Sequence, residues 1–557
     1  MASSEWIDPE DLVSALESPH SVSQAVRSAR LTLRSTPEIR KEYGRARGFW
    51  EALARVWSEQ AKKLEQDDRD VVPIVQALAA FLIGLTSADA YNQLQALAHI
   101  EPHLRSILST SSSLFHLEDS LYQPMTRTCC QALANLVTSN PTACSTYFPE
   151  RLQAEESDLL LQRLLATPDE ATLQAVLIFL LNAIHSDPGR ALLLGTSRAG
   201  SAILDRIMIL VSATYDNDSQ ANPAPTSLEG SDLFGLSFSI MKQIIEQGAF
   251  PQTYSEHKLL PGFLVSPTLI VFLKYLDGYL SSHLSSPEPL ALSTSLSVIP
   301  FLQAQLALLA AHLLDKGERE RSDALGFQGV VLILHALCEI GLGFERHFQR
   351  ESEEEAERSN ETVKAEGNAK LSGSVELVVR LLHYSSSSIP GVSARPTPDS
   401  SRRISEIDPE NPASIPRPAT APIHDDTICG QVDHPESTAP GSAGFQQLKL
   451  ICVKFLGIVT FQPFNSASGR RFRRDRMAVV EAIQDEIRES GGLGLLLGMC
   501  QIDGRNPTLR EHALLAIRNI LKNNLRNQEY IDNMKPQYKV GEDGSLLDLP
   551  PPLRPPE

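Results

Sequence analysis

Apolar residues recur at intervals of three and four along most of this chain, which is the spacing of one face of an α-helix. The clearest stripe lies in residues 173–184, where positions i, i+3, i+4, i+7, i+8 and i+11 are all leucine, valine or isoleucine. Residues 330–341 are apolar almost all round, as expected of a helix covered by neighbours on both sides. No region shows sustained alternation of apolar and polar residues. The pattern therefore predicts an all-α chain.

Three of the predicted helices share an apolar run interrupted by an asparagine, at Asn135, Asn182 and Asn519. Asn135 and Asn182 are 47 residues apart, within the roughly 40–47 residues of an armadillo or HEAT repeat. A related run has Gly457 instead; it lies 62 residues before Asn519, and 47 if the polar and basic stretch 462–476 is an insertion. The recurrence predicts an armadillo/HEAT-like helical-repeat solenoid, in which stacked helix pairs bury each other's faces and leave one continuous surface.

Composition shifts divide the chain into five predicted parts. Residues 1–70 form a helical cap and residues 71–384 the armadillo-like helical repeats. Residues 385–443 contain ten prolines and few large apolar side chains, so they are predicted to be a disordered Ser/Pro-rich linker. A second helical block covers residues 444–534, and the proline-rich tail 535–557 is expected to lack structure.

Charge and composition narrow the function classes. The chain has 557 residues and a formal net charge of −18, which disfavours general binding to nucleic acid. The N-terminus shows no signal peptide, and the longest apolar stretch, 71–85, is shorter than the roughly 18 residues of a membrane span. Seven cysteines are scattered without framework spacing. We therefore expect a cytoplasmic protein with reduced thiols and no membrane insertion.

No catalytic or metal-binding signature stands out. The chain lacks the common phosphate-binding, nucleophile-elbow and zinc-protease motifs. Copper(I) would require converging thiolate or thioether ligands, and no C-x-x-C or methionine-rich cluster occurs. Cys129 and Cys130 are adjacent on a predicted helix, so one is expected in the core and the other outside it. His335, in an apolar helix, is expected to be a core histidine. The sequence predicts no cofactor, no metal and no enzymatic activity.

The C-terminal block carries a specific motif cluster: GGL at 491–493, CQIDGRNP at 500–507, RE at 510–511, AIRNI at 516–520 and NQEYI at 527–531. It resembles the signature of the ataxin-10 family over residues 445–534, with Asp503, Asn506 and Pro507 as signature positions. The resemblance implies a cytosolic solenoid associated with cytokinesis and cell-division control, without known enzymatic activity. The fungal branch of the family also carries a copper-transport name.

The candidate partner surface comprises the repeat asparagines and three charged residues of the signature helix, Arg510, Glu511 and Arg518. The asparagines either hydrogen-bond a partner's backbone or bridge neighbouring repeats. The charged residues either form a contact edge or pair with one another and with adjacent helices. Asn506 and Pro507 are predicted to cap and begin the signature helix.

Two basic segments have regulatory interpretations. The cluster 470–476 is either a solvated loop between helices or a nuclear-import or acidic-partner patch. In the linker, Arg402 and Arg403 precede Ser405, a candidate phosphosite whose modification would add negative charge beside two arginines.

These observations favour a non-enzymatic scaffold that binds other proteins. The alternative is an armadillo-type regulator of a small GTPase or a chaperone ATPase, and a remote one is a copper homeostasis factor.

Overall fold

The structure is a computed structural model. It describes residues 8–17, 22–35, 38–153, 160–218, 232–257, 265–283, 289–315, 324–350, 367, 369–387, 442–462, 470–501, 506–534, 538–540 and 546–548.

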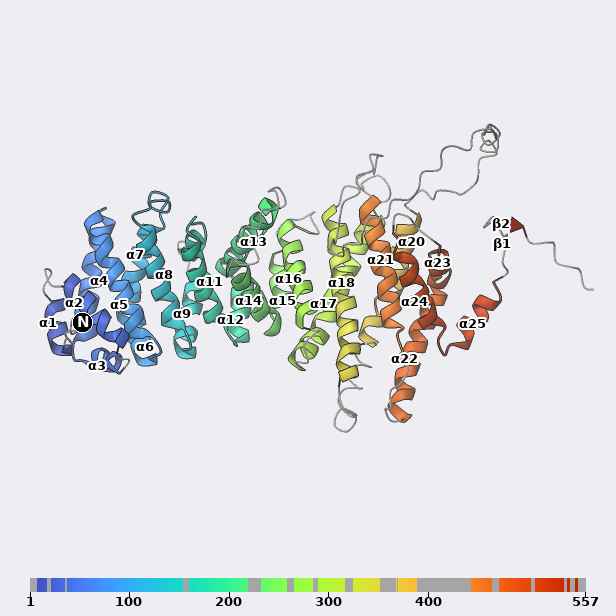
Figure 1. The fold of residues 1–557 in the computed structure, drawn as a ribbon, viewed down its shortest axis with the longest axis horizontal. Helices are drawn as coiled ribbons and strands as arrows, with labels where there is room; N and C mark the ends of the chain where they lie inside the picture. The colour runs from blue at the N-terminus through green and yellow to red at the C-terminus, as the bar shows by residue number, and fades with distance from the viewer. Residues whose placement is uncertain are drawn as a thin grey trace, which may run out of the picture. The chain divides into compact units, whose positions relative to one another are not determined.

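The described chain is helical almost throughout, as predicted (Figure 1). Its N-terminal helices are α1 (Pro9–Leu16), α2 (Val22–Ser35), α3 (Ile39–Arg45), α4 (Phe49–Glu65), the 3₁₀ turn η1 (Arg69–Val71), α5 (Val72–Thr86), α6 (Ala90–His99), α7 (Glu101–Ser111), α8 (Gln123–Val137), α9 (Pro141–Gln153) and α10 (Leu160–Leu164). They are followed by α11 (Glu170–Ile184), α12 (Pro188–Thr196), α13 (Arg198–Asp218), α14 (Asp232–Glu246), α15 (Phe250–Glu256), α16 (Pro267–His283), α17 (Pro289–Asp315) and α18 (Ala324–Arg350). The C-terminal elements are α20 (Val375–Ser387), α21 (Ser442–Val459), α22 (Arg470–Glu489), α23 (Gly492–Gly498), α24 (Leu509–Leu521), α25 (Leu525–Asp532), β1 (Tyr538–Val540) and β2 (Leu546–Asp548).

The chain folds as two compact units. The first comprises residues 1–309 and 328–371 with 467–469, and the second comprises residues 310–327, 372–466 and 470–557.

The first unit is a stack of helical repeats. Helices α2, α5, α8, α11 and α14 pack side by side in this order and form one layer (Figure 1). Contacts of α4 with α7 and of α13 with α16 belong to a second row of helices, and contacts of α12 with α9 and α15 belong to a third. The apolar stripe of α11 is buried between its neighbours, with Leu173, Val176, Leu177, Leu180 and Ile184 all in the core. This layered packing is the helical-repeat fold that the sequence predicts.

The same turn recurs at the joints between repeats. Ala88, Ser139 and Ser186 each adopt a positive φ, a conformation that costs an L-residue about 1 kcal/mol. The next residue caps the following helix: the Asp89 side chain accepts from the Asn92 amide at 3.0 Å. Asn140 and Asp187 act in the same way on α9 and α12. Each joint therefore turns the chain by the same local device.

The second unit repeats this arrangement on a smaller scale. Helices α20, α21 and α24 pack side by side, and α22, α23 and α25 cover them. Its joint before α25 again has a positive φ, at Asn523, followed by the cap Asn524. Helix α20 packs against α21 although the predicted linker separates them in sequence. The structure therefore places the end of the predicted repeat region in the same unit as the C-terminal block.

Two expectations about local structure are wrong. Residues 470–476 are not a loop, because α22 begins at Arg470 and includes the whole basic cluster. Arginine, which makes up five of these seven residues, is a good helix former. The predicted insertion 462–476 therefore overlaps a helix. In the tail, β1 and β2 form an antiparallel pair with Lys539 opposite Leu547, since Tyr538, Val540 and the leucines favour extended backbone. Most of the predicted linker lies outside the described residues.

Within the part of the chain that the structure describes, three helical segments are long and apolar enough to span a membrane by length and composition: residues 69–86, 296–315 and 325–345. The expectation that no stretch reaches this length is therefore wrong, because each helix continues beyond its apolar run. About half of each segment is buried inside the fold, 50%, 44% and 56% respectively.

Candidate partner-binding surface

The repeat asparagines of the first unit bridge neighbouring repeats. The Asn135 amide donates to the Ile83 carbonyl at 3.1 Å and to the Thr86 hydroxyl at 2.7 Å, both on α5. The Asn182 amide donates to the hydroxyl of Thr138, at the end of α8, at 2.9 Å. Both side chains are half-buried. Of the two interpretations of these residues, bridging is the one that the structure shows, and a role in partner binding stays a prediction.

Asn519 has the same position in the second unit. Its amide donates to the Gly457 carbonyl on α21 at 2.9 Å. Gly457 stands where the repeat pattern would place another asparagine, and a β-carbon built there would lie 3.4 Å from that of Ala516. The missing side chain therefore lets α21 and α24 approach closely, and Asn519 bonds the backbone that is exposed there.

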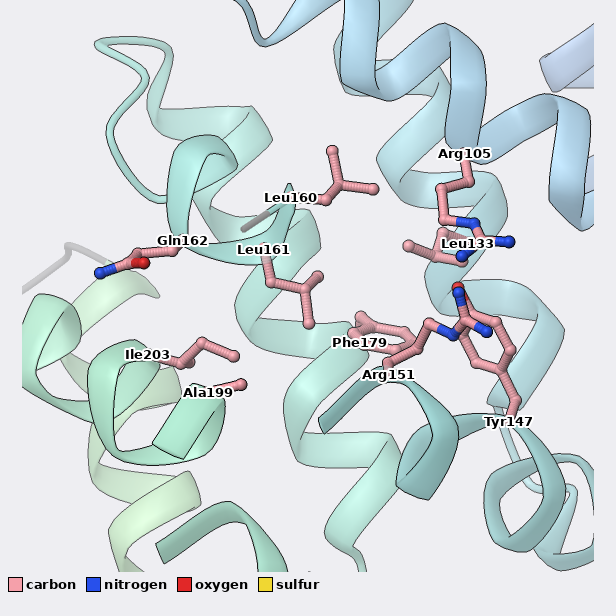
Figure 2. Close-up of a pocket in the computed structure, with 10 residues that line it drawn as sticks. All are labelled: Arg105, Leu133, Tyr147, Arg151, Leu160, Leu161, Gln162, Phe179, Ala199 and Ile203. Carbon is pink, nitrogen blue, oxygen red and sulfur yellow. The ribbon is translucent and has the colours of Figure 1, made fainter. Parts of the chain in front are cut away.

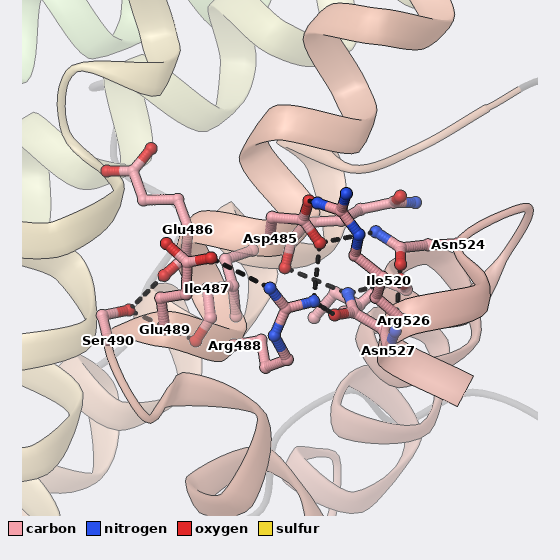
Figure 3. A network of polar contacts seen from close by, with 11 residues as sticks. Asp485, Glu486, Ile487, Arg488, Glu489, Ser490, Ile520, Asn524, Arg526 and Asn527 are labelled. Carbon is pink, nitrogen blue, oxygen red and sulfur yellow. Dashed lines mark hydrogen bonds and ion pairs between the residues drawn. The ribbon is translucent and has the colours of Figure 1, made fainter. Parts of the chain in front are cut away.

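A polar network holds α22 against the joint between α24 and α25 (Figure 3). Asp485 accepts hydrogen bonds from Arg488 at 2.7 Å and from Asn524 at 3.1 Å, and forms an ion pair with Arg526 at 3.3 Å. Burial alone would raise the pKa of Asp485, but these hydrogen bonds and the arginine charges hold its pKa below the ordinary value. The carboxylate is thus ionised and occupied by its neighbours.

Asn527 is the most enclosed member of this network, with no exposed surface. Its amide donates to the carbonyls of Gln484 at 3.0 Å and Ile520 at 3.2 Å, and its side-chain oxygen accepts from Arg488 at 2.7 Å. Asn92 does the same in the first unit, where its amide bonds the carbonyls of Arg40 and Leu85. The network is therefore a repeat joint rather than a reaction centre.

Glutamines complete the parallel between the two units. Gln93 donates to the carbonyls of Asn135 and Thr138, and Gln484 donates to those of Asn519 and Lys522. These joint residues were missed in the sequence. A signal was present, since each repeat asparagine is followed five positions later by a capping Asn or Asp, at residues 140, 187 and 524.

The prediction that Asn506 caps the signature helix, α24, is wrong. Helix α24 begins at Leu509 with Thr508 at the cap position, and no cap side chain bonds its first turn. The Asn506 amide instead donates to the Gln446 carbonyl on α21 at 3.1 Å, and Asn506 is buried. Asn506 is therefore used for packing between helices, while Pro507 lies exposed in the turn before the helix.

The charged candidates lie on the surface of α24. Arg510, Glu511 and Arg518 are all exposed. Among the described residues, Arg510 and Glu511 have no ion-pair partner, so the predicted pairing of Glu511 with neighbouring arginines is not what the structure shows. Leu514 and Leu515 lie between them and are 48% and 51% exposed. The structure thus brings apolar and charged side chains together on one exposed helix face.

A cavity of about 30 Å³ lies among α7 to α11 and α13 (Figure 2). Leu133, Leu160 and Phe179 give it an apolar lining, with Arg105 and Tyr147 at one side. The charge of Arg105 is met by the buried Glu101, whose carboxylate also accepts from the Tyr147 hydroxyl at 2.7 Å. A space of this size holds roughly two water molecules, and we assign no substrate to it.

The residues weighed for metal and acid–base chemistry have other surroundings. Cys129 and Cys130 are both fully buried, so the expectation that one lies outside the core is wrong; burial raises the pKa of both thiols. His335 is not a core histidine, because its side chain is 42% exposed and bonded to Asp277. Among the described residues, no group of three metal-ligating side chains converges. Asp503, Ser405 and Cys429 lie outside the described residues.

Fold and surface together define this protein as an armadillo/HEAT-like helical-repeat protein with exposed helix faces. Residues 479–548 match the family profile of the spinocerebellar ataxia type 10 protein domain. The C-terminal segment is thus similar to the ataxin-10 domain, which confirms the resemblance seen in the sequence over that segment. The match begins inside α22 and runs through the strand pair, so it starts later and ends later than the predicted domain 444–534.

Curated relatives match over similarly short segments. The chain is 46% identical over 61 residues to the ataxin-10 homolog of Saccharomyces cerevisiae, which is 11% of each chain. It is 41% identical over 66 residues to that of Dictyostelium discoideum, 12% of this chain and 11% of the relative. Ataxin-10 of Xenopus tropicalis is 43% identical over 64 residues, 12% of this chain and 13% of the relative. Each alignment spans only about a tenth of the relative's own length.

Similar solved structures include one titled for a phosphorylation switch in the interaction between cadherin and beta-catenin, with a TM-score of 0.31, 12% identity and coverage of 92% of this chain and 99% of that chain. Importin beta gives a TM-score of 0.23 and 10% identity, covering 94% of this chain and 68% of that chain. Both scores are low, so the fold assignment depends on the helix packing described above.

Proposed function

We propose that this protein is a non-enzymatic scaffold that binds other proteins through the exposed faces of its stacked helices. The observation that supports this most directly is the surface of α24, where half-exposed leucines stand among Arg510, Glu511 and Arg518. Apolar anchors ringed by polar side chains are the usual composition of a protein-binding surface. The finer expectation, a partner from the cell-division machinery, derives from the ataxin-10 resemblance.

The test is affinity purification of the full chain from dividing cells, quantified by mass spectrometry. An Arg510→Ala/Arg518→Ala variant should lose at least one partner that the unaltered chain captures. The matched control is Arg45→Ala/Arg55→Ala, which removes two exposed arginines from the first unit. If the unaltered chain captures no stable partner, the scaffold proposal fails. If partner recovery is the same in all three, α24 is not the binding surface.

A nucleotide-release assay distinguishes the scaffold from the alternative function, regulation of a GTPase or a chaperone ATPase. Purified chain is mixed with each partner that binds a nucleotide. Accelerated release would favour the regulator, and unchanged release with stable binding would favour the scaffold. Cytokinesis is tested by counting multinucleate cells after replacement of the chain with the arginine variant.

A further inference from the structure

One face of α24 is uncovered although the same face of the corresponding helices in the first unit is covered. The repeat asparagines give a common register for α8, α11 and α24. Five positions before each asparagine stand Cys130, Leu177 and Leu514. Cys130 and Leu177 are 1% and 4% exposed, whereas Leu514 is 48% exposed.

Helix geometry shows which way this face points. At about 100° per residue, the mean direction of Leu514 and Arg518 is roughly 150° from the mean direction of Ala516 and Asn519. Ala516 and Asn519 contact α21, as the 3.4 Å approach at Gly457 and the hydrogen bond to its carbonyl show. Leu514, Glu511 and Arg518 therefore point away from α21. They face the side on which the next helix of a stack would lie.

The first unit shows what covers such a face. Helix α11 packs along α8 and covers Cys130 and Ala134, the counterparts of Leu514 and Arg518. The counterpart of Glu511 is Arg127, which forms a two-point ion pair with Asp169, the residue that caps α11. In this fold the natural cover of the face is therefore another helix, fixed at its edge by an opposite charge.

The charge of the region selects the kind of helix. Over residues 445–534 the excess of 13 Lys and Arg over 9 Asp and Glu lies in the cluster 470–476, so the charge at α24 depends on the residues of its own face. Arg510 and Arg518, four residues before and after Leu514 on α24, are both exposed. Burial lowers the pKa of Lys522, and the nearby charge of Arg518 lowers it further. The exposed face of α24 therefore combines a leucine with two arginines and one glutamate.

We propose that an amphipathic helix of a partner protein, with acidic residues beside its apolar stripe, docks on the Glu511–Leu514–Arg518 face of α24 and continues the helical stack. This inference rests on the proposed scaffold function and names its binding face and the chemistry of its partner. The partner helix takes the place that α11 has on α8, with its apolar residues on Leu514 and its acids toward Arg510 and Arg518.

The first experiment places the photo-crosslinker p-benzoylphenylalanine at residue 514 of the full chain in cells. A crosslinker at Ile209, which is 53% exposed on α13, is the control. The expected product at 514, absent at 209, is a peptide of another protein with apolar residues at helical spacing and flanking acids. Crosslinking to residues 535–557, to a second copy of this chain or to a non-helical sequence overturns the proposal, as does the absence of any product.

The second experiment measures binding of that crosslinked peptide, made synthetically, by fluorescence anisotropy. Leu514→Asp and Arg518→Glu should each weaken binding to the full chain at least about fivefold, and Ile209→Asp should leave it unchanged. Replacing the peptide's acids with lysines should restore affinity for Arg518→Glu only. Equal affinity for all variants overturns the docking face, whereas the scaffold function itself fails only if the unaltered chain captures no partner.

Discussion

A single substitution at Asn527 should weaken the packing of α22 against the joint between α24 and α25. Asn527→Ala removes three hydrogen bonds at once, two to the main-chain carbonyls of Gln484 and Ile520 and one from Arg488. The side chain has no exposed surface, so water does not readily replace the lost donor. Each buried polar group left without a partner costs about 1–3 kcal/mol. The Gln484 carbonyl keeps its helix hydrogen bond within α22, and Arg488 keeps its bonds to Asp485 and Glu489. Counting the three lost hydrogen bonds at about 1 kcal/mol each, we expect a loss of about 3 kcal/mol.

This loss should appear as faster hydrogen exchange. A decrease of about 3 kcal/mol in the local opening free energy corresponds to roughly 100-fold faster exchange of the affected amides. Exchange is followed by mass spectrometry in peptides from α22, the end of α24 and α25. Peptides from α8 and α11 serve as an internal reference, because they belong to the other unit.

Two further variants check the reasoning. Arg526→Ala removes an ion pair whose arginine is 74% exposed, so exchange should change less than about threefold. Asn92→Ala removes the equivalent bonds in the first unit, but its side-chain oxygen has no partner there, so its effect should be smaller than that of Asn527→Ala. If Asn527→Ala and Arg526→Ala gave the same exchange rates, the joint would not depend on the buried amide.

Three other predictions follow from local geometry. Gly200→Ala places a β-carbon 2.2 Å from the Leu194 carbonyl oxygen and should lower the unfolding free energy by about 1–3 kcal/mol. A β-carbon at Gly235 would have nothing within 4 Å, so Gly235→Ala should raise the unfolding free energy by up to about 1 kcal/mol. Urea titrations measure both changes. The pKa of Asp485 is lowered in the folded chain, so its contribution to stability is present above the ordinary carboxyl pKa of 3.8 and is lost as pH falls through and below that value. The difference in exchange protection of α25 between the unaltered chain and Asp485→Asn should therefore shrink on acidification. A difference that stayed constant with pH would contradict this. Phe115→Ser should leave the melting temperature unchanged, because Phe115 is 91% exposed; a clear drop would show that its ring is buried in solution.

The C-terminal domain shows how far sequence reasoning reached. Local apolar spacing predicted its helices, and the motif cluster around Asn506 and Asn519 indicated the similarity to the ataxin-10 domain that residues 479–548 show. The predicted role of Asn506 was wrong because an asparagine before a proline can either cap a helix or form a hydrogen bond to another helix. Only the position of Gln446, 60 residues earlier in sequence, decides between them. The basic cluster was assigned to a loop because its charge, rather than its helix propensity, was given more weight.

What the sequence by itself determined is the helical-repeat class, since the period of apolar residues is a property of neighbouring positions along one segment. It also contained the recurring asparagine, which marks the end of a repeat. Only the tertiary structure decided that Asn135 and Asn182 bond across repeats, that Cys129 and Cys130 are both covered, and that Leu514 is not. Burial depends on which element stacks on a face, and that element lies tens of residues away in the chain. For this reason the same register position is core in α8 and α11 and surface in α24.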